Sequence, residues 1–175
     1  MKILSGIYKG MHIKTSLKQN YRPTQTKVRK SIFDSLGSLE DYSVLDLFSG
    51  TGILGFESAS RGASSVVFVE KNTFIYKMLK TNASLFYNGN FKIKRNDAIR
   101  FLKNSGSFDL IFADPPYNYF NRNTGIDVDL FINMILDKLN LQGRFIFECP
   151  HRINVCYPVK TKVFGETKVC VGRKE

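Results

Sequence analysis

The sequence is poor in the features that mark secreted, metal-binding and membrane proteins. Its three cysteines, Cys149, Cys156 and Cys170, are odd in number and lack a C-x-x-C spacing, so neither a disulfide framework nor a metal site is expected. No apolar run is long enough for a membrane span, and glycine and lysine interrupt residues 1–10 before the apolar core of a secretion signal can form. A chain of 175 residues with 43% hydrophobic content can build one sizeable core. We therefore expect a cytoplasmic protein with one main domain and no membrane partner.

Acidic residues are absent from the N-terminal part of the chain. Residues 1–33 contain no Asp or Glu, and their basic residues supply most of the net charge of +11. Such a one-sided excess attracts polyanions through phosphate contacts and counterion release, although many charge runs are only solvated faces. We favour nucleic acid as the partner. Six basic side chains are the candidate contacts: Lys9, Lys14, Arg22, Lys27, Arg29 and Lys30.

Two elements are predicted in this basic part of the chain. Short runs of strand-forming residues broken by glycines predict a β-hairpin, which forms a basic appendage over residues 1–20 ahead of a main domain over residues 21–175. Residues 24–36 then carry apolar side chains at helical spacing, and a glycine ends the pattern. This predicts an amphipathic helix whose outer side carries Lys27, Arg29 and Lys30.

From residue 44 onward, predicted strands alternate with predicted helices. Short apolar or alternating runs indicate strands, and segments with a period of 3.6 residues indicate helices. Such an alternation predicts a parallel sheet with helices on both faces. The last two strands are joined by a turn too short for a crossover, so they must be antiparallel to each other. The strands are expected at residues 44–48, 64–70, 91–95, 108–114, 144–149, 157–164 and 167–172, and the helices at 53–61, 73–87, 98–103 and 127–140.

Four carboxylates stand at the carboxyl ends of the predicted parallel strands, where ligands of such sheets bind. Asp46, Glu70 and Asp114 lie at the ends of three strands, and Asp97 follows a fourth. Each has an ordinary alternative, because Asp97 is well placed to cap the next helix and Asp46 to bond the following turn. Four such residues on neighbouring strands nevertheless indicate one ligand site.

The segment DLFSGTGILG, residues 46–55, combines an acid with the pattern G-x-G-x-x-G. A dinucleotide would place its pyrophosphate at this loop, where the charge of Asp46 would oppose it. S-adenosylmethionine instead carries a cationic sulfonium, an amino group and hydroxyls, all of which suit carboxylates. The glycines still make sense, because they let the backbone approach the ligand closely. The loop therefore favours S-adenosylmethionine, with Glu70 on its ribose and Asp97 near its adenine.

Residues 114–118, DPPYN, fit the methylation of an exocyclic amine on a nucleobase. The lone pair of such an amine is delocalised into the ring, and acceptors on its hydrogens favour a localised pair aimed at the methyl group. Asp114 and the Pro115 carbonyl are such acceptors, and Pro116 biases Pro115 toward an extended conformation. Tyr117 can stack on the extruded base. The alternative is a plain turn after a strand, but the position downstream of an acidic glycine loop favours catalysis.

Six segments occur in the order found in one methyltransferase family. They are ILSGIYKG, RPTQTKVRKSIFDSL, VLDLFSGTGILGFESASRGA, VFVEKN, DPPY and KVFGETKV, and they cover almost the whole chain. The chain resembles the RsmD-type small-subunit (16S) rRNA guanine-N2 methyltransferases. Many methyltransferases share the glycine loop or DPPY, so the N-terminal segments are the specific part. The resemblance implies an α/β, class I methyltransferase fold, Rossmann-like, with a seven-stranded, mostly parallel sheet, an antiparallel C-terminal hairpin and a small N-terminal β-hairpin.

The resemblance also implies an activity and a partner. The enzyme would use S-adenosyl-L-methionine to methylate the exocyclic N2 of one guanine in small-subunit rRNA, within the assembled ribosomal subunit. Nothing in the sequence demands more than a monomer. From motifs and resemblance together, the candidate catalytic residues are Asp114, Pro115, Pro116 and Tyr117, and the candidate cofactor-binding residues are Asp46, Phe48, Ser49, Gly50, Thr51, Gly52, Glu70, Lys71, Asp97 and Ala98.

Two alternatives stay open at the level of sequence. The first is N6-methylation of adenine in DNA or RNA, because adenine presents an amine to the same four DPPY residues. The second is an RNA-binding ribosome assembly factor without catalysis. The intact Asp46 and Asp114 weigh against the second, because a binding module need not retain either carboxylate.

Overall fold

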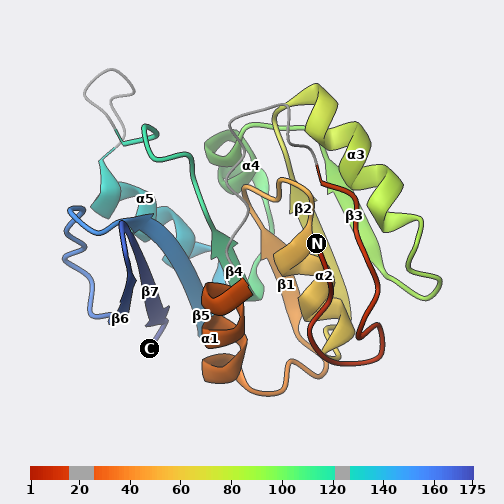
Figure 1. The fold of residues 1–175 in the computed structure, drawn as a ribbon. Helices are drawn as coiled ribbons and strands as arrows, with labels where there is room; N and C mark the ends of the chain where they lie inside the picture. The colour runs from red at the N-terminus through yellow and green to blue at the C-terminus, as the bar shows by residue number, and fades with distance from the viewer. Residues whose placement is uncertain (16–25, 121–126) are drawn as a thin grey trace.

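The computed structural model describes residues 1–15, 26–120 and 127–175 (Figure 1). Helices and strands alternate along the chain as the sequence predicts. The helices are α1 (Thr26–Leu36), α2 (Ile53–Ser60), α3 (Thr73–Ala83), α4 (Ala98–Asn104) and α5 (Val128–Asp137), and the strands are β1 (Ser43–Asp46), β2 (Ser65–Val69), β3 (Phe91–Lys94), β4 (Phe108–Ala113), β5 (Leu139–Pro150), β6 (Lys160–Phe164) and β7 (Thr167–Arg173).

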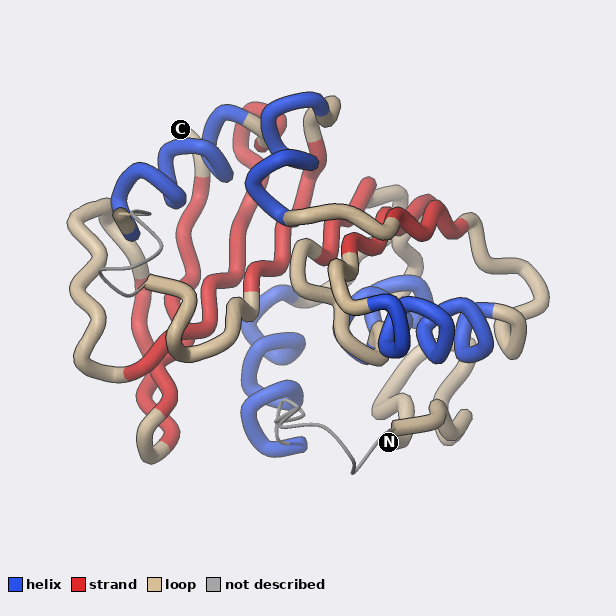
Figure 2. Tube along the Cα trace, turned by 90° about the horizontal axis from the view of Figure 1, so that it is seen from above, coloured by secondary structure: helices blue, strands red, loops and turns tan. Residues whose placement is uncertain are grey.

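A seven-stranded sheet runs through the molecule in the order β3-β2-β1-β4-β5-β7-β6. The first five strands in this order are parallel, whereas β7 is antiparallel to both of its neighbours, β5 and β6. Helices α1, α2 and α3 lie on one face of the sheet, and α4 and α5 lie on the other (Figure 2). The α/β fold with an antiparallel C-terminal hairpin is thus confirmed. Its strand order reverses at β1 and β4, and the crevice outside the carboxyl ends of such strands is the usual ligand site.

Each face of the sheet packs against its own apolar core. In β4, Leu110 and Phe112 belong to the core on the side of α1, α2 and α3, whereas Ile111 and Ala113 belong to the core on the side of α4 and α5. All four side chains are buried. Burial on both faces explains why this strand is a continuous apolar run in the sequence rather than an alternating one.

Residues 1–15 fold back on themselves and pack against the main domain. An antiparallel bridge joins Lys2 to His12, and the Ile3 amide donates to the Met11 carbonyl at 2.9 Å. Ile3 and Tyr8 are buried in the same core as α1 and α2. The predicted hairpin is therefore present in reduced form, with pairing limited to this bridge in the described residues, and it shares a core with the sheet instead of standing apart.

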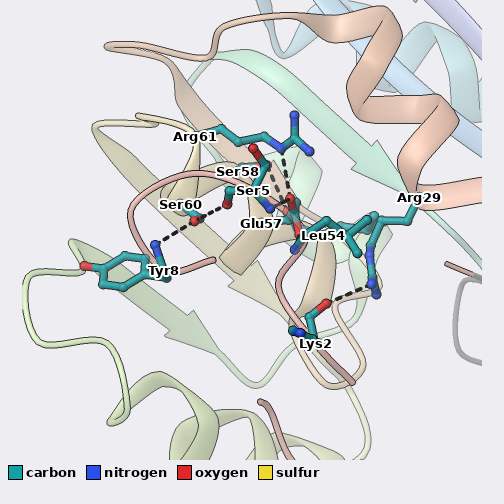
Figure 3. A network of polar contacts seen from close by, with 10 residues as sticks. Lys2, Ser5, Tyr8, Arg29, Leu54, Glu57, Ser58, Ser60 and Arg61 are labelled. Atoms are coloured by element: carbon teal, nitrogen blue, oxygen red, sulfur yellow. Dashed lines mark hydrogen bonds and ion pairs between the residues drawn. The ribbon is translucent and has the colours of Figure 1, made fainter. Parts of the chain in front are cut away.

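A buried carboxylate on α2 anchors this N-terminal segment (Figure 3). Glu57 accepts hydrogen bonds from the backbone amides of Leu4 at 2.8 Å and Ser5 at 3.1 Å, and it forms an ion pair with Arg61 at 2.9 Å. The side chain of Glu57 is fully buried. A carboxylate that accepts several charge-assisted hydrogen bonds tolerates burial, so Glu57 fixes the position of the N-terminal segment on the domain.

Arg29 does not lie on the outer side of α1, and the prediction that it contacts RNA is wrong. Its side chain is 1% exposed, and Nη2 donates to the Lys2 carbonyl at 2.9 Å. The helix turns Arg29 toward the N-terminal segment, where the long side chain packs while its guanidinium reaches a backbone acceptor. Lys27 is exposed as predicted. Lys30 is also exposed, but it pairs with Asp34 at 2.7 Å. Arg22 lies outside the described residues.

Several element boundaries differ from those predicted, and the differences are largest at α3 and β5. Helix α3 ends at Ala83, four residues before the predicted end, and β5 begins at Leu139, inside the predicted helix 127–140. Leu139 pairs with Phe108 of β4, and the register then shifts before Arg144 pairs with Leu110. Tertiary pairing has overridden the helical pattern of these residues. None of the helices in the described ranges is both long and apolar enough to cross a membrane.

Candidate active site

A cavity of about 880 Å³ opens at the carboxyl ends of β1, β2, β4 and β5. This volume lies within the range of roughly 300–1,000 Å³ that is typical of small-molecule sites. The cavity brings together most of the predicted site residues, although they come from distant parts of the chain. Those in its lining are Phe48, Gly50, Glu70, Lys71, Asp97, Ala98, Asp114, Pro115, Pro116 and Tyr117.

Ser49 fixes the glycine loop between β1 and α2 to the end of β2. The Ser49 amide donates to the Val69 carbonyl at 3.1 Å, and the Val69 amide donates to Ser49 Oγ at 2.9 Å. Gly50 and Gly52 have φ values of 53° and 89°. A Cβ on Gly52 would lie 2.4 Å from the Phe56 ring. The loop therefore requires glycine at position 52 for both conformation and space.

Asp46 directly precedes this loop and does not line the cavity. Its Oδ2 accepts a hydrogen bond from the Gly55 amide at 3.1 Å, and the residue is 3% exposed. Burial raises the pKa of Asp46 to about 7, against the lowering effect of the Gly55 bond, and the nearby charges of Asp114 and Glu70 raise it further. Asp46 is therefore partly protonated at neutral pH. Its attraction to a cationic ligand stays a prediction, because the side chain is bonded to the first turn of α2 and does not line the cavity.

Glu70 holds the other side of the loop and lines the cavity. One carboxylate oxygen accepts from the Gly50 amide at 3.0 Å, and the other accepts from the Asn72 amide at 2.6 Å. Partial burial raises the pKa of Glu70, and these backbone hydrogen bonds oppose the rise. A carboxylate fixed at both oxygens is pre-oriented, and its remaining lone pairs can accept hydrogen bonds from vicinal hydroxyls.

Asp97 serves both as the helix cap and as part of the cavity wall. Its Oδ1 accepts from the Ile99 and Arg100 amides at 3.1 and 3.3 Å, and Lys71 Nζ lies 3.2 Å from its Oδ2. Partial burial favours the neutral acid, but the hydrogen bonds from Arg100 and Lys71 outweigh it and hold the pKa of Asp97 below its usual range. Asp97 therefore stays ionised at this edge of the cavity.

The DPPY segment forms another part of the cavity wall. Asp114 is the first residue after β4, and the Tyr119 amide donates to the Pro116 carbonyl at 2.8 Å, which closes a tight turn. The Tyr117 hydroxyl is hydrogen-bonded to the Thr167 hydroxyl at the start of β7. Thr167 is buried, whereas Tyr117 is 37% exposed. The Tyr117 ring is thus held at its far end and leaves a face accessible at the cavity.

Glu148 and Tyr119 are among the cavity-lining residues that sequence reasoning missed. Glu148 is 8% exposed near the carboxyl end of β5. The rule that singled out Asp114, a carboxylate at the end of a predicted strand, would have found it. The Tyr119 ring meets the Phe48 ring edge-on at 5.1 Å between centroids, and burial raises the pKa of Tyr119 to about 12, with a further rise from Asp97. No spacing pattern marked Tyr119.

The exposed N-terminal lysines are joined to the glycine loop by a short chain of hydrogen bonds. The Lys14 amide donates to Asn82 Oδ1 at 2.8 Å, and Asn82 Nδ2 donates to the Thr51 carbonyl at 3.0 Å. Lys9 and Lys14 are both exposed. The segment that carries these two charges is therefore held at a fixed position relative to the loop. Three predicted loop residues, Ser49, Thr51 and Gly52, are buried and do not line the cavity.

Residues 1–171 match the family described as Conserved hypothetical protein 95. The chain belongs to this family. Among curated relatives, it is 38% identical over 67% of its length to the Bacillus subtilis protein YlbH, whose name gives it provisionally as an rRNA methyltransferase. It is 36% identical over 66% of its length to the Ribosomal RNA small subunit methyltransferase D of Buchnera aphidicola. The matched region spans 67% and 62% of these two relatives.

Solved structures share the fold. The Escherichia coli protein yhhF, provisionally described as a methyltransferase, superposes with a TM-score of 0.84 and 25% identity over 100% of this chain and 98% of its own. The Thermus thermophilus 16S rRNA N2 G1207 methyltransferase RsmC, solved with AdoMet and guanosine, has a TM-score of 0.69 and 22% identity, and covers 91% of this chain and 45% of its own. The class I methyltransferase fold expected from the sequence is confirmed.

Proposed function

We propose that this protein is an S-adenosylmethionine-dependent methyltransferase that modifies the exocyclic N2 of a specific guanine in small-subunit (16S) rRNA. One observation carries this proposal: the Asp-Pro-Pro-Tyr segment and the glycine loop line the same cavity. The names of the rRNA methyltransferase relatives support the same activity. A cofactor site and an amine-activating site thus lie within reach of one another.

The cofactor fits the half of the cavity formed by β1, β2 and α4. The carboxylate of Glu70, fixed by the Gly50 and Asn72 amides, accepts hydrogen bonds from the ribose hydroxyls. Asp97 and Ala98 lie where the adenine binds, and Phe48 offers an apolar wall. When bound, S-adenosylmethionine supplies an electrophilic methyl group on a cationic sulfur. The excess of carboxylates in this half favours such a cation over an anionic dinucleotide.

The target base fits the half formed by the DPPY segment. Asp114 and the Pro115 carbonyl accept the two hydrogens of the amine, so that its lone pair points toward the methyl group. As the new nitrogen–carbon bond forms, the carbon–sulfur bond breaks with its electron pair on sulfur, and Asp114 accepts the proton that the amine releases. Tyr117 stacks on the base, a contact worth about 1–3 kcal/mol.

The substrate in this proposal is rRNA within the assembled small subunit, in the cytoplasm, and the enzyme acts as a monomer. Lys9, Lys14 and Lys27 are exposed, and they provide phosphate contacts around the unstacked loop base. Lys30 is a weaker candidate because Asp34 already neutralises it. Arg22 is kept as a proposed contact from the sequence alone.

The test is to incubate the protein with labelled S-adenosylmethionine and small subunits from cells that lack it, alongside free rRNA. Mass spectrometry then identifies the methylated nucleoside and its position. N2-methylguanosine in the subunit is the expected product. N6-methyladenosine would replace the proposal with the adenine alternative, and full RNA binding without any transfer would favour the non-catalytic assembly factor.

A further inference from the structure

Glu148 lies beside Asp114 in the half of the cavity assigned to the base. In the parallel pair of β4 and β5, Ala113 is the register partner of Phe147, and Asp114 and Glu148 directly follow these two residues. Both carboxylates line the cavity. Neighbouring strands lie about 4.8 Å apart, so two carboxyl groups at one level of adjacent strands can reach neighbouring atoms of a single base.

The order of the strands sets the direction in which the base must extend. Glu70 follows β2, Asp114 follows β4 and Glu148 lies on β5, and the sheet order places β1 and β4 between β2 and β5. With the cofactor on the β2 side and the reacting amine at Asp114, the rest of the base extends away from the cofactor. One of the two ring atoms that flank the amine then faces Glu148.

Guanine and adenine differ at the ring atoms that flank the amine. The C2 amine of guanine lies between N1, which carries a hydrogen, and N3, which carries a lone pair, whereas the C6 amine of adenine lies between N1, which carries only a lone pair, and C5. An ionised carboxylate accepts hydrogen bonds and cannot donate them. Resting on the function proposed above, we propose that Glu148 accepts the N1 hydrogen of the target guanine and thereby selects guanine over bases without that hydrogen.

The burial of Glu148 makes this contact selective. At 8% exposure, the carboxylate has little access to water that could replace a missing donor. A site built to bond a substrate N–H rejects analogues without it, because a buried polar group then loses its partner and faces a repulsive lone pair. In the proposed site, Asp114 activates the amine and Glu148 recognises the adjacent N1 hydrogen.

Analogues at the mapped target nucleotide test this role. 2-Aminopurine keeps the C2 amine but lacks the N1 hydrogen and O6, whereas 6-thioguanine keeps both the amine and the N1 hydrogen. The wild-type protein should methylate guanine and 6-thioguanine at similar rates, and 2-aminopurine at a kcat/KM lower by roughly 100-fold or more.

Glu148→Gln should reverse this preference in part, because the amide of glutamine can donate to the N1 lone pair of 2-aminopurine. We expect kcat/KM on guanine to fall by about 10- to 100-fold, and the ratio between guanine and 2-aminopurine to approach one. Glu148→Asp keeps the carboxylate and should keep the preference at a reduced rate. Glu166→Gln, which removes the same charge from an exposed position outside the cavity lining, is the matched control.

Cofactor affinity, measured by calorimetry, should be the same in the wild-type protein and in the three variants. It also reports correct folding. If Glu148→Gln lowers the rate but leaves the ratio as in the wild type, Glu148 only supports the structure and the inference is wrong. If Glu148→Gln does not fold, Glu148→Asp becomes the test. Loss of the preference for guanine over 2-aminopurine in Glu148→Asp would then overturn the inference. A wild-type protein that methylates no guanine would instead overturn the proposed function, and with it this role of Glu148.

Discussion

Two regions of the molecule are rich in charge, but their charges have different roles. One is the cavity edge, at the carboxyl ends of the parallel strands, and the other is the N-terminal face, where residues 1–15 pack on α1 and α2. At the cavity edge, Glu70 and Asp97 accept hydrogen bonds from backbone amides and still line the cavity. On the N-terminal face, Glu57 and Arg29 are buried completely in the contact between residues 1–15 and the domain. Glu70 and Asp97 therefore keep lone pairs available to a ligand, whereas Glu57 and Arg29 use the same kind of charge to anchor the N-terminal segment. Changes at the cavity edge should alter transfer and cofactor binding, whereas changes on the N-terminal face should alter stability or RNA affinity.

The largest effect is expected for Asp114→Ala. Loss of the proton acceptor and of one amine contact should lower the rate of methyl transfer about 10³-fold or more. Cofactor affinity should survive, because the cofactor occupies the other half of the cavity. Single-turnover transfer and calorimetry measure the two quantities. Asp137→Ala removes an exposed carboxylate at the end of α5 and should change neither. Normal methylation by Asp114→Ala would remove this residue from the mechanism.

The next largest effect is on the free energy of unfolding, which should depend on pH because of Asp46. Its pKa of about 7 in the folded protein lies above the ordinary aspartate value of 3.8, so the folded state binds a proton more tightly than the unfolded state. The resulting stability is present in full below about pH 4 and is lost as pH rises through 7, a change of about 4 kcal/mol. The raised pKa of Glu70 acts in the same direction.

Asp46→Asn should flatten this dependence between pH 4 and 7, as measured by chemical unfolding without cofactor. It should also weaken cofactor binding, because a cation favours the ionised form of Asp46. Wild-type affinity for S-adenosylmethionine should accordingly rise with pH across the same window. An Asp46→Asn protein with unchanged affinity and an unchanged pH profile would show that the carboxyl charge has neither effect.

A smaller effect, confined to stability, is expected on the N-terminal face for Arg29→Met. Methionine keeps much of the aliphatic packing but loses the bond to the Lys2 carbonyl, so the free energy of unfolding should fall by about 1–3 kcal/mol. The salt dependence of RNA binding should not change, since Arg29 is buried. A reduced salt slope in a folded Arg29→Met protein would contradict the assignment of Arg29 as an anchor.

The smallest effect is expected for Lys9→Ala combined with Lys14→Ala. This double variant should change RNA affinity little but should clearly change its dependence on salt. Two lost phosphate contacts should reduce the slope of log affinity against log salt by about 1.4–1.8. The rate of transfer at saturating RNA should stay the same. Lys30→Ala, which removes a lysine already paired with Asp34, should change the slope less and serves as the comparison. If the double variant has the wild-type slope, the two lysines do not contact phosphates.

Much of the site was predictable because one topological rule applies to many residues. Once strands and helices alternate, every residue just beyond a parallel strand lies at the same edge, and this placed Glu70, Asp97 and Asp114 correctly. The same rule also covers Glu148, near the end of the predicted strand 144–149. Asp46 lies at this edge as well, but its side chain bonds the Gly55 amide in α2, and strand position does not reveal that direction.

The N-terminal face was less predictable, because helical spacing does not say what packs on each side. The pattern of α1 placed Arg29 outside, because Arg29 lies off the apolar face that the spacing defines. The N-terminal segment covers that side of the helix and receives the Arg29 guanidinium at the Lys2 carbonyl. The start of β5 at Leu139 is a similar case, because strand pairing with Phe108 overrides the local helical pattern.

The sequence by itself determined the class of fold, the glycine loop and the DPPY segment, because local hydrophobic period and short motifs are properties of neighbouring residues. Only the tertiary structure decided which charges reach the cavity and which are buried as anchors. That outcome depends on contacts between segments far apart in the chain, such as Leu4 with Glu57 and Tyr117 with Thr167. Burial and the partners it brings together then set whether a carboxylate binds a ligand, holds a proton or holds the chain in place.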